Sequence, residues 1–205
     1  DAVIAGLEPY DRALLSTAKK LKVISRYGVG YDKVDLDAAR ELGIKVSITP
    51  GANGDSVADL AMALMLNAAR HVCHMDAVIR AGGHDKPVTG VEMWKKTLGV
   101  VGTGRIGKAV IHNLSGFGCR IIAHDPYPSE EMKQMGVEYV SLESLYAQSD
   151  VITLHTFLND STYHMINTEA IQQMKPGVVI INCARGALID TRALIDGIES
   201  GRVGS

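Results

Sequence analysis

The sequence predicts an α/β protein built on a doubly wound parallel sheet. Short apolar runs recur along the chain, and segments with helical periodicity separate most of them. Strands that alternate with helices form βαβ units, whose parallel strands are buried on both faces and therefore carry nearly continuous apolar residues. One of these runs also leads directly into a glycine-rich turn that opens a helical pattern.

The first part of the chain contains three expected strands, the apolar runs AVIAG, KVISRY and IKVSI at residues 2–6, 22–27 and 44–48. Val and Ile favour extended backbone because their branched side chains restrict rotation. A polar turn, TPGANG, and a long apolar helix pattern follow the third run. We therefore expect a domain change near residue 53, with one domain over 1–52 and a second over 53–205.

The segment DSVADLAMALMLNAARHV, residues 55–72, predicts a helix with Asp55 as its N-cap. Beyond Asp59 this helix is apolar on nearly every side until Arg70, so it must be covered all round. We expect it to connect two domains, to form the interface of a homodimer, or to do both. A central core helix of a single domain is the alternative.

The remaining strands and helices alternate without an internal repeat. We expect the strands TLGVVG, RIIAHD, VEYV, DVITLH and GVVIINC, at residues 97–102, 120–125, 137–140, 150–155 and 177–183. The segments with helical periodicity lie at residues 105–116, 129–135, 142–148, 168–174 and 190–200.

Composition and charge exclude several classes of partner. The 205 residues have a formal net charge of −2 and no block of Lys and Arg, which argues against nucleic acid or an anionic membrane surface. The N-terminal stretch lacks the features of a signal peptide, and the most apolar stretch, residues 60–69, is too short to span a bilayer. The three cysteines fit no disulfide framework or zinc pattern, so we expect a reducing, cytoplasmic compartment.

The run TLGVVGTGRIGKAV, residues 97–110, contains a G-x-G-x-x-G pattern between an expected strand and an expected helix. In a Rossmann-type unit Gly102 allows the tight turn, Gly104 lets a pyrophosphate approach the backbone, and Gly107 lets helix and strand pack closely. The helix N-terminus then faces the phosphates with free N–H groups. A glycine-rich turn that binds nothing is the alternative, and the context disfavours it.

The next strand, RIIAHD, ends in Asp125. A carboxylate at this position accepts hydrogen bonds from the ribose hydroxyls of adenosine and repels a 2′-phosphate. Pro126, Tyr127 and Pro128 follow, without an arginine that could bind a phosphate. The sequence therefore predicts NAD rather than NADP as the cofactor.

The chain resembles the D-isomer-specific 2-hydroxyacid dehydrogenases, the family that includes D-3-phosphoglycerate dehydrogenase. Four blocks carry the resemblance and together span nearly the whole chain: SRYGVGYDKVD (25–35), TPGANGDSVADLAMALML (49–66), GVVGTGRIG (99–107) and MKPGVVIINCARGALID (174–190). The resemblance implies an NAD domain of the Rossmann type inserted into a flavodoxin-like substrate domain, with the active site in the cleft between them.

The resemblance also implies roles for individual residues. Arg185 would be the catalytic arginine that holds the carboxylate and carbonyl of a small 2-hydroxy or 2-oxo acid, and the backbone of Val29 and Gly30 would bind the same carboxylate. Arg105 and Ile106 would contact the pyrophosphate, and Asp125 the ribose. The other cofactor-binding residues would be Gly102, Thr103, Gly104, Gly107, His155, Thr156, Thr162, Cys183 and Ala184, with Arg185 also lining the nicotinamide side.

Physical arguments support these assignments independently. Ligands of open parallel sheets bind beyond the carboxyl ends of the strands, where Asp125, His155 and Arg185 are all expected. The planar guanidinium of an arginine grips a carboxylate with two hydrogen bonds and stays charged. Near the carbonyl it also stabilises the negative charge that develops on oxygen during hydride transfer.

The chain departs from the family pattern at two places. Phe157 stands where the family usually has a proline, and it would either reshape the nicotinamide wall or pack. The family also continues into a segment with a catalytic Glu and a later one with the catalytic His that exchanges a proton with the substrate. Neither segment is present. Glu199 is most simply a solvated helix residue, and we expect the chain to be an internal piece of a longer protein.

Three other features contain residue types that are common in functional sites. His71, Cys73 and His74 form HVCH, but a metal site needs three or four convergent ligands and no other cluster supports one. Cys183 lacks an obvious base partner, so we expect it to pack rather than act as a nucleophile. His124 would line the rim of the adenine pocket or face solvent.

These observations predict an NAD-dependent 2-hydroxyacid dehydrogenase that transfers a hydride between nicotinamide and C2 of its substrate. The alternative is a non-catalytic NAD-binding module of the corepressor type, because the 205 residues lack the family's Glu and His. D-3-phosphoglycerate, D-lactate with pyruvate, and glyoxylate with hydroxypyruvate remain open as substrates.

Overall fold

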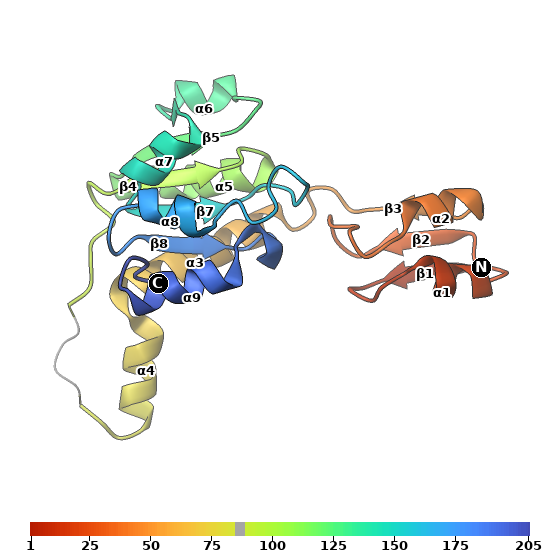
Figure 1. Cartoon of the computed structure of the whole chain (residues 1–205), viewed down its shortest axis with the longest axis horizontal. Coiled ribbons are helices and arrows are strands. Elements are labelled where there is room, and N and C mark those ends of the chain that lie inside the picture. The colour runs from red at the N-terminus through yellow and green to blue at the C-terminus, as the bar shows by residue number, and fades with distance from the viewer. Residues whose placement is uncertain (85–88) are drawn as a thin grey trace. The chain divides into compact units, whose positions relative to one another are not determined.

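The computed structural model describes residues 1–84 and 89–205. The chain divides into two compact units, Asp1–Gly54 and Asp55–Ser205 (Figure 1). Each unit has its own sheet and its own buried core.

The Asp1–Gly54 unit is a parallel sheet of three strands in the order β1-β2-β3. The strands are β1 (Ala2–Ala5), β2 (Val23–Arg26) and β3 (Lys45–Ser47), in agreement with the expected runs. Two short helices connect them, α1 (Arg12–Thr17) and α2 (Leu36–Glu41), as expected for βαβ units. Each begins after an aspartate N-cap, Asp11 or Asp35, whose carboxylate accepts a backbone N–H of the first turn.

The Asp55–Ser205 unit contains a parallel five-stranded sheet in the order β6-β5-β4-β7-β8. The strand order reverses between β4 and β7, which makes the carboxyl ends of these two strands a topological switch point, the usual ligand site of such sheets. All five strands were expected, and they are β4 (Thr97–Val101), β5 (Arg120–His124), β6 (Glu138–Tyr139), β7 (Val151–Leu154) and β8 (Val179–Asn182).

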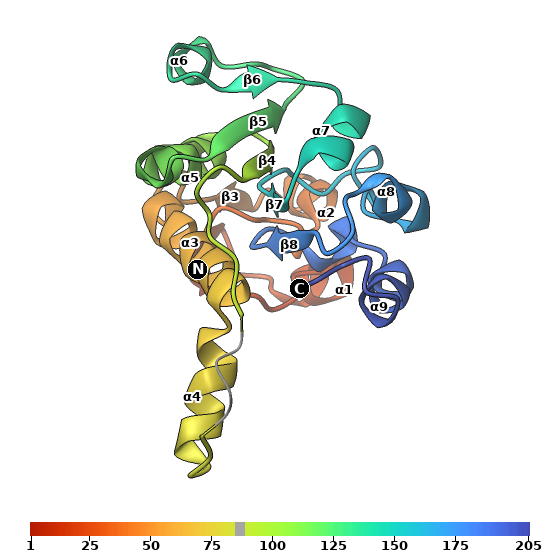
Figure 2. The same cartoon turned by 90° about the vertical axis from the view of Figure 1, so that its left-hand side faces the viewer.

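Helices cover both faces of this sheet, which confirms the doubly wound architecture (Figure 2). One face carries α3, α5 and α6, and the other carries α7, α8 and α9. Their bounds follow the expected segments closely: α5 (Arg105–Leu114), α6 (Glu130–Gln134), α7 (Leu142–Gln148), α8 (Thr168–Gln173) and α9 (Thr191–Glu199), with 3-10 turns η1 (Ser115–Phe117) and η2 (Gly186–Leu188).

Buried aliphatic side chains hold each helix layer against the sheet. On one face Ala61 and Met65 of α3 and Leu114 of α5 pack with Leu98 and Ile181 of the strands. The opposite face contains the larger cluster, which includes the fully buried Ile152, Leu154, Ile166 and Leu188. These two cores fix the carboxyl ends of β4, β5, β7 and β8 along one edge of the unit.

The expected helix over residues 55–72 is present but ends two residues earlier, at Arg70, and a second helix follows it. α3 spans Gly54–Arg70, and Asp55 lies in its first turn rather than at its N-cap. His71 adopts a left-handed conformation with φ 56°, which ends α3, and α4 (Val72–Arg80) begins immediately after it. Apolar patterning did not signal this break, because it lies in the backbone of a single residue.

The apolar surface of α3 and α4 is only partly covered within the chain. Four residues at helical spacing, Ala58, Ala61, Met65 and Ala69, are buried against the sheet. On other sides of the helices Leu60 is 53% exposed and Ile79 is 65% exposed. No residue of α4 is buried, and Figure 2 shows this helix extending away from the rest of its unit.

Two features that would indicate other functions are absent from the described residues. Over 1–84 and 89–205, no helix is both long and apolar enough to cross a membrane. In the same residues, no three His, Cys, Asp or Glu side chains gather closely enough to hold a metal ion.

Candidate cofactor and substrate site

The glycine-rich turn joins β4 to α5 and has the backbone that the sequence predicts. Gly102 follows β4 with φ 91°, a conformation that side chains rarely adopt. A β-carbon on it would also lie 2.6 Å from the carbonyl oxygen of His155 at the end of β7. Gly102 therefore has to be glycine for two reasons, the turn itself and the close approach of the neighbouring strand.

The other two glycines of the turn differ in their surroundings. A β-carbon on Gly107 would lie 2.0 Å from the carbonyl oxygen of Gly102, so helix α5 can pack this closely only without a side chain there. Gly104 is the N-cap of α5 and has no atom within 4 Å of an added β-carbon. No side chain caps the first turn of α5, which leaves its N–H groups available to an anion.

Asp125 lies immediately after β5, beside this turn. Its Oδ2 accepts a hydrogen bond from the backbone N–H of Thr103 at 2.6 Å and another from the Thr103 hydroxyl at 3.1 Å. Its Oδ1 accepts the backbone N–H of Tyr127 at 2.8 Å. The carboxylate is thus fixed against the phosphate-binding turn, where a ribose hydroxyl would need an acceptor.

His124 precedes Asp125 and ties the end of β5 to its neighbour. Its Nδ1 lies 3.1 Å from the carbonyl oxygen of Val140, just beyond β6. The ring is half-buried, so it neither faces bulk solvent fully nor is enclosed. Its visible role is to hold the strand end that presents Asp125.

His155 follows β7 and is the most strongly perturbed group of the site. Burial lowers the pKa of its imidazole to about 4, and Nε2 lies 2.9 Å from the hydroxyl of Thr153. Its backbone N–H donates to the carbonyl oxygen of Val101, which continues the β4–β7 ladder. The imidazole is therefore neutral at pH 7, and Thr156 comes next along this edge.

The loop after His155 determines where Thr162 and Phe157 lie. The Thr162 hydroxyl donates to the carbonyl oxygen of Phe157 at 2.6 Å and accepts the backbone N–H of Asn159 at 2.9 Å. In this structure its proton is directed into its own loop, and contact with a pyrophosphate stays a prediction. The Phe157 ring is 79% exposed, so it does not pack within its own unit.

The segment after β8 presents Cys183, Ala184 and Arg185. Asn182 braces it: its Nδ2 donates to the carbonyl oxygen of Arg185 at 2.8 Å, and its Oδ1 accepts the backbone N–H of Ala184 at 2.9 Å. The half-buried Arg185 donates from Nη1 to the Ala184 carbonyl oxygen at 3.1 Å. Sequence analysis missed Asn182, although an Asn at a strand end, two residues before a turn N–H, is a recognisable side-chain turn motif.

In the Asp1–Gly54 unit, Val29 and Gly30 lie in the loop that follows β2. Arg26, only 7% exposed, donates to the carbonyl oxygens of Ala5 and Tyr27 and so holds the ends of β1 and β2 together. Gly28 has φ 137°, and its N–H donates to the Thr49 hydroxyl at 3.1 Å. Arg26 shapes this loop, and an arginine inside an apolar strand run was the signal that sequence analysis did not use.

The site residues of the larger unit therefore meet at one sheet edge: the turn after β4, Asp125 after β5, His155 after β7 and Arg185 after β8. A sequence model described as D-isomer specific 2-hydroxyacid dehydrogenase, NAD binding domain, matches residues 62–205. The chain belongs to the D-isomer-specific 2-hydroxyacid dehydrogenase family. Its match to that domain also identifies NAD as the cofactor.

Three relatives illustrate the family membership. The hydroxypyruvate reductase of Thermotoga maritima is 46% identical over 191 residues, which are 93% of this chain and 62% of that protein. The D-3-phosphoglycerate dehydrogenase of Methanocaldococcus jannaschii is 46% identical over 195 residues, 94% of this chain and 37% of that protein. A structure of D-lactate dehydrogenase from Aquifex aeolicus, complexed with NAD and lactic acid, matches with a TM-score of 0.91 at 34% identity, covering 100% of this chain and 62% of that one.

The residues of this dehydrogenase family member fit NAD on two structural grounds. The turn offers open backbone at Gly104 between two positions, Gly102 and Gly107, that tolerate no side chain. The Asp125 carboxylate lies beside that turn and accepts hydrogen bonds there, as recognition of a ribose diol requires. The open backbone of the turn and the acceptor beside it thus agree with the family assignment.

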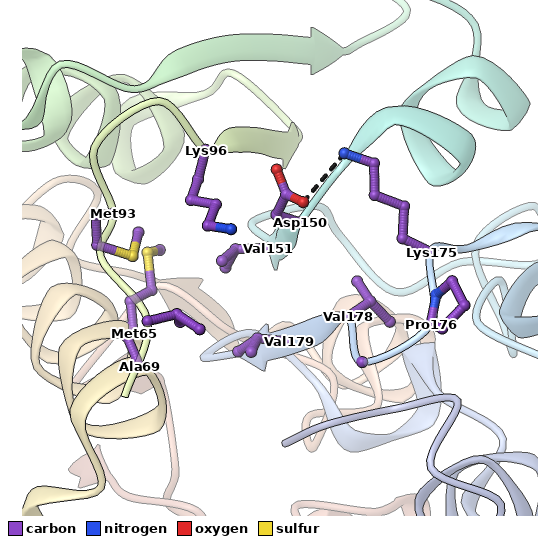
Figure 3. A pocket seen from close by; sticks show the side chains of 12 residues that line it. Met65, Ala69, Met93, Lys96, Asp150, Val151, Lys175, Pro176, Val178 and Val179 are labelled. Atoms are coloured by element: carbon purple, nitrogen blue, oxygen red, sulfur yellow. Dashed lines mark hydrogen bonds and ion pairs between the residues drawn. The ribbon is translucent and has the colours of Figure 1, made fainter. Parts of the chain in front are cut away.

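A separate hollow of about 220 Å³ lies at the opposite edge of this NAD-binding domain, where the strands begin (Figure 3). Met65, Met93 and Val179 form part of its wall, and Lys175 donates to Asp150 at 3.1 Å at its side. Asp150 also accepts the backbone N–H of Thr97, so this ion pair ties strand beginnings together. The hollow shares no residue with the cofactor site.

Proposed function

We propose that the protein is an NAD-dependent oxidoreductase that transfers a hydride between nicotinamide and C2 of a 2-hydroxy or 2-oxo acid. One observation carries the proposal: the phosphate-binding turn, Asp125 and Arg185 lie at the carboxyl ends of strands of one parallel sheet. The chain spans 62% and 37% of the lengths of the two curated relatives described above, so the activity of the whole protein is inferred from a part of it.

Arg185 is the residue we assign to the substrate. Bound NAD supplies or accepts the hydride, and the residues of this chain orient the two reactants. The guanidinium grips the substrate carboxylate and stabilises charge on the carbonyl oxygen. Val29 and Gly30 offer backbone N–H groups to the same carboxylate. We assign the cofactor to the turn residues Gly102, Thr103, Gly104, Arg105, Ile106 and Gly107, and to Asp125, His155, Thr156, Thr162, Cys183 and Ala184.

The domain assignment follows from these roles. We propose that residues 1–52 are part of the substrate domain and that residues 53–205 form the NAD-binding domain. The boundary between the two compact units falls between Gly54 and Asp55 of the sequence, close to this division. The Asp1–Gly54 unit presents Val29 and Gly30 after one of its strands, as a substrate-binding loop would require.

A proton must accompany the hydride, and neither His155 nor Glu199 is suited to supply it. His155 is unsuited to this role, because burial lowers its pKa to about 4 and leaves it mostly neutral at physiological pH. Glu199 ends α9 on the surface. We assign the transfer of this proton to the Glu and His that the family resemblance implies.

The experiment that tests the function uses the full-length gene product. NADH oxidation is measured with pyruvate, glyoxylate, hydroxypyruvate and the 2-oxo acid derived from D-3-phosphoglycerate. We expect at least one to be reduced, and Arg185→Ala to lower kcat/KM on it by more than tenfold, about 1.4 kcal/mol. Tight NADH binding without reduction of any 2-oxo acid would favour the corepressor-type NAD-binding module instead.

We also propose that the protein is a homodimer that uses the uncovered faces of α3 and α4. Leu60 and Leu64, on α3, are large apolar side chains exposed in the chain by itself, and α4 has no buried residue. We expect Leu60→Lys to shift the sedimentation coefficient toward that of a monomer. Leu14→Lys, a change at a similarly exposed leucine of α1, is the matched control and should leave the dimer intact.

We propose that the protein is located in the cytoplasm. Cys73, Cys119 and Cys183 are all free thiols, as a reducing environment would keep them. Cell fractionation followed by immunodetection would test this proposal, and recovery from an oxidising compartment would contradict it.

A further inference from the structure

A chain of hydrogen bonds runs from the start of α6 to Asp125 through two side chains that sequence patterns did not connect. The backbone N–H of Ser129 donates to the phenol oxygen of Tyr139 at 3.0 Å. The Tyr139 hydroxyl donates to the hydroxyl oxygen of Thr103 at 2.9 Å. The Thr103 hydroxyl in turn donates to Oδ2 of Asp125 at 3.1 Å.

Strand pairing brings these groups together. Tyr139 lies in β6 opposite Ala123 of β5, two residues before Asp125 on the same strand end. Its phenol reaches across to Thr103, which is 4% exposed and belongs to the phosphate-binding turn after β4. Three strands that are neighbours in the sheet thus contribute one residue each: Thr103 after β4, Asp125 after β5 and Tyr139 in β6.

The chain has a fixed direction because its ends cannot reverse roles. A backbone N–H only donates, and an ionised carboxylate only accepts. Each hydroxyl has a single proton, so Tyr139 must give its proton to Thr103, and Thr103 must give its own to Asp125. The side chain of Thr103 is therefore set in one rotamer by a donor on one side and an acceptor on the other.

This arrangement decides which lone pairs of Asp125 remain for a ligand. A carboxylate offers about four acceptor positions. Thr103 occupies Oδ2 through both its hydroxyl and its N–H, and Tyr127 occupies one position of Oδ1 through its N–H. The remaining capacity lies on Oδ1, so the carboxylate is held with one oxygen committed to the turn and the other left for a ribose hydroxyl.

We propose that Tyr139 is a positioning residue that sets the preference for NAD over NADP by fixing Asp125 through Thr103. Tyr139 acts at a distance from the ligand, and the inference rests on the assignment of Asp125 to the ribose. With the phenol removed, the carboxylate gains freedom to turn away from the ribose. A turned carboxylate accepts the 2′-hydroxyl of NADH less well and repels the 2′-phosphate of NADPH less strongly.

The test measures the dissociation constants of NADH and NADPH on the full-length protein by fluorescence titration, without turnover. We expect Tyr139→Phe to reduce the preference for NADH by roughly fivefold, the factor that corresponds to the loss of one hydrogen bond worth about 1 kcal/mol. Thr103→Val, which breaks the same chain without touching the ring, should reduce the preference similarly. Thr103→Ser, which keeps the hydroxyl, should retain it.

Tyr146→Phe is the matched control. Its phenol also donates one hydrogen bond, to the carbonyl oxygen of Met165 at 3.0 Å, and it lies in α7 on the other face of the sheet. This variant should lower the melting temperature and leave the NADH-to-NADPH ratio unchanged. A coupling test adds Tyr139→Phe to Thr103→Val, and we expect no further change in the ratio because the link is already broken.

Two outcomes would overturn the inference, and they are distinguishable. If wild-type protein prefers NADH and folded Tyr139→Phe keeps the full preference, Tyr139 has no positioning role while the NAD assignment stands. If the wild type binds NADPH as tightly as NADH, the role of Asp125 is wrong, and the role of Tyr139 falls with it. Should Tyr139→Phe fail to fold, Tyr139→Met, which also lacks the phenol hydroxyl, takes its place in the same titration.

Discussion

The carbonyl oxygen of Gly102 occupies the position where a side chain of Gly107 would begin, 2.0 Å from an added β-carbon. This contact presses the first turn of α5 against the end of β4. It brings the uncapped N–H groups of the helix to the point where a pyrophosphate would bind. Gly104, between the two, has open space at the corresponding position.

We therefore expect Gly107→Ala to lower stability and Gly104→Ala to weaken NADH binding. Backbone atoms cannot move away cheaply from a β-carbon on Gly107, so we expect a loss of about 3 kcal/mol or more of unfolding free energy. Gly104 has φ −68°, which alanine adopts readily, so Gly104→Ala should fold normally and bind NADH at least tenfold more weakly. Urea unfolding and fluorescence titration separate the two results. A stable Gly107→Ala variant would show that the contact is not tight.

We expect the free energy of unfolding to decrease as the pH is lowered, because of His155. Burial lowers the pKa of His155 to about 4, below the ordinary value of 6.5, so between these values the unfolded chain binds more protons than the folded one. The contribution of His155 is full above pH 6.5 and is lost as the pH falls toward 4. We expect about 2 kcal/mol less unfolding free energy at pH 5 than at pH 7 from this group. His155→Gln, measured by urea unfolding at pH 5 and pH 7, should lack this part of the pH dependence. If its unfolding free energy changes between the two pH values as much as that of the wild type, the imidazole is not buried in its neutral form.

We expect a substitution of Asn182 to lower the turnover of substrate more than it disturbs the phosphate-binding turn. Its amide holds the backbone on both sides of the Ala184–Arg185 peptide, so Asn182→Ala releases the segment that aims Arg185. We expect kcat/KM on the best 2-oxo acid to fall about tenfold, because small misplacements of an orienting group are costly. Asn182→Asp is the companion variant: it keeps the acceptor for Ala184 and replaces the donor to the Arg185 carbonyl oxygen by a charged carboxylate oxygen. Equal kcat/KM for the wild type, Asn182→Ala and Asn182→Asp would show that Asn182 does not orient this segment.

Cysteine alkylation tests whether Cys183 is a packing residue. Burial raises the pKa of Cys183 and of Cys119, which lowers the fraction of reactive thiolate, whereas Cys73 is exposed. Iodoacetamide at neutral pH should modify Cys73 first, as peptide mass spectrometry would show. Cys73→Ser should then leave a protein that reacts slowly. Rapid modification of Cys183 would instead revive its interpretation as a nucleophile.

Much of the cofactor site was visible in the sequence because it depends on local backbone rules. The glycine spacing at 102, 104 and 107 predicts a turn, a helix start and a close contact, and the structure contains all three. Asp125 could be placed because an apolar run ends directly before it. These features follow from residues a few positions apart, which is the range over which sequence patterns carry structural information.

Local sequence patterns could not predict the break at His71 or the distant side chains that hold the site residues in place. A left-handed residue between α3 and α4 leaves no trace in apolar periodicity. Tyr139 touches Thr103 only because β6 pairs with β5 and β5 with β4, and Arg26 touches Ala5 only because β1 pairs with β2. The sequence by itself determined the α/β class, the phosphate-binding turn and the strand-end positions of Asp125, His155 and Arg185. Only the tertiary structure decided which distant side chains hold them, because strand order and register bring together residues that are far apart along the chain.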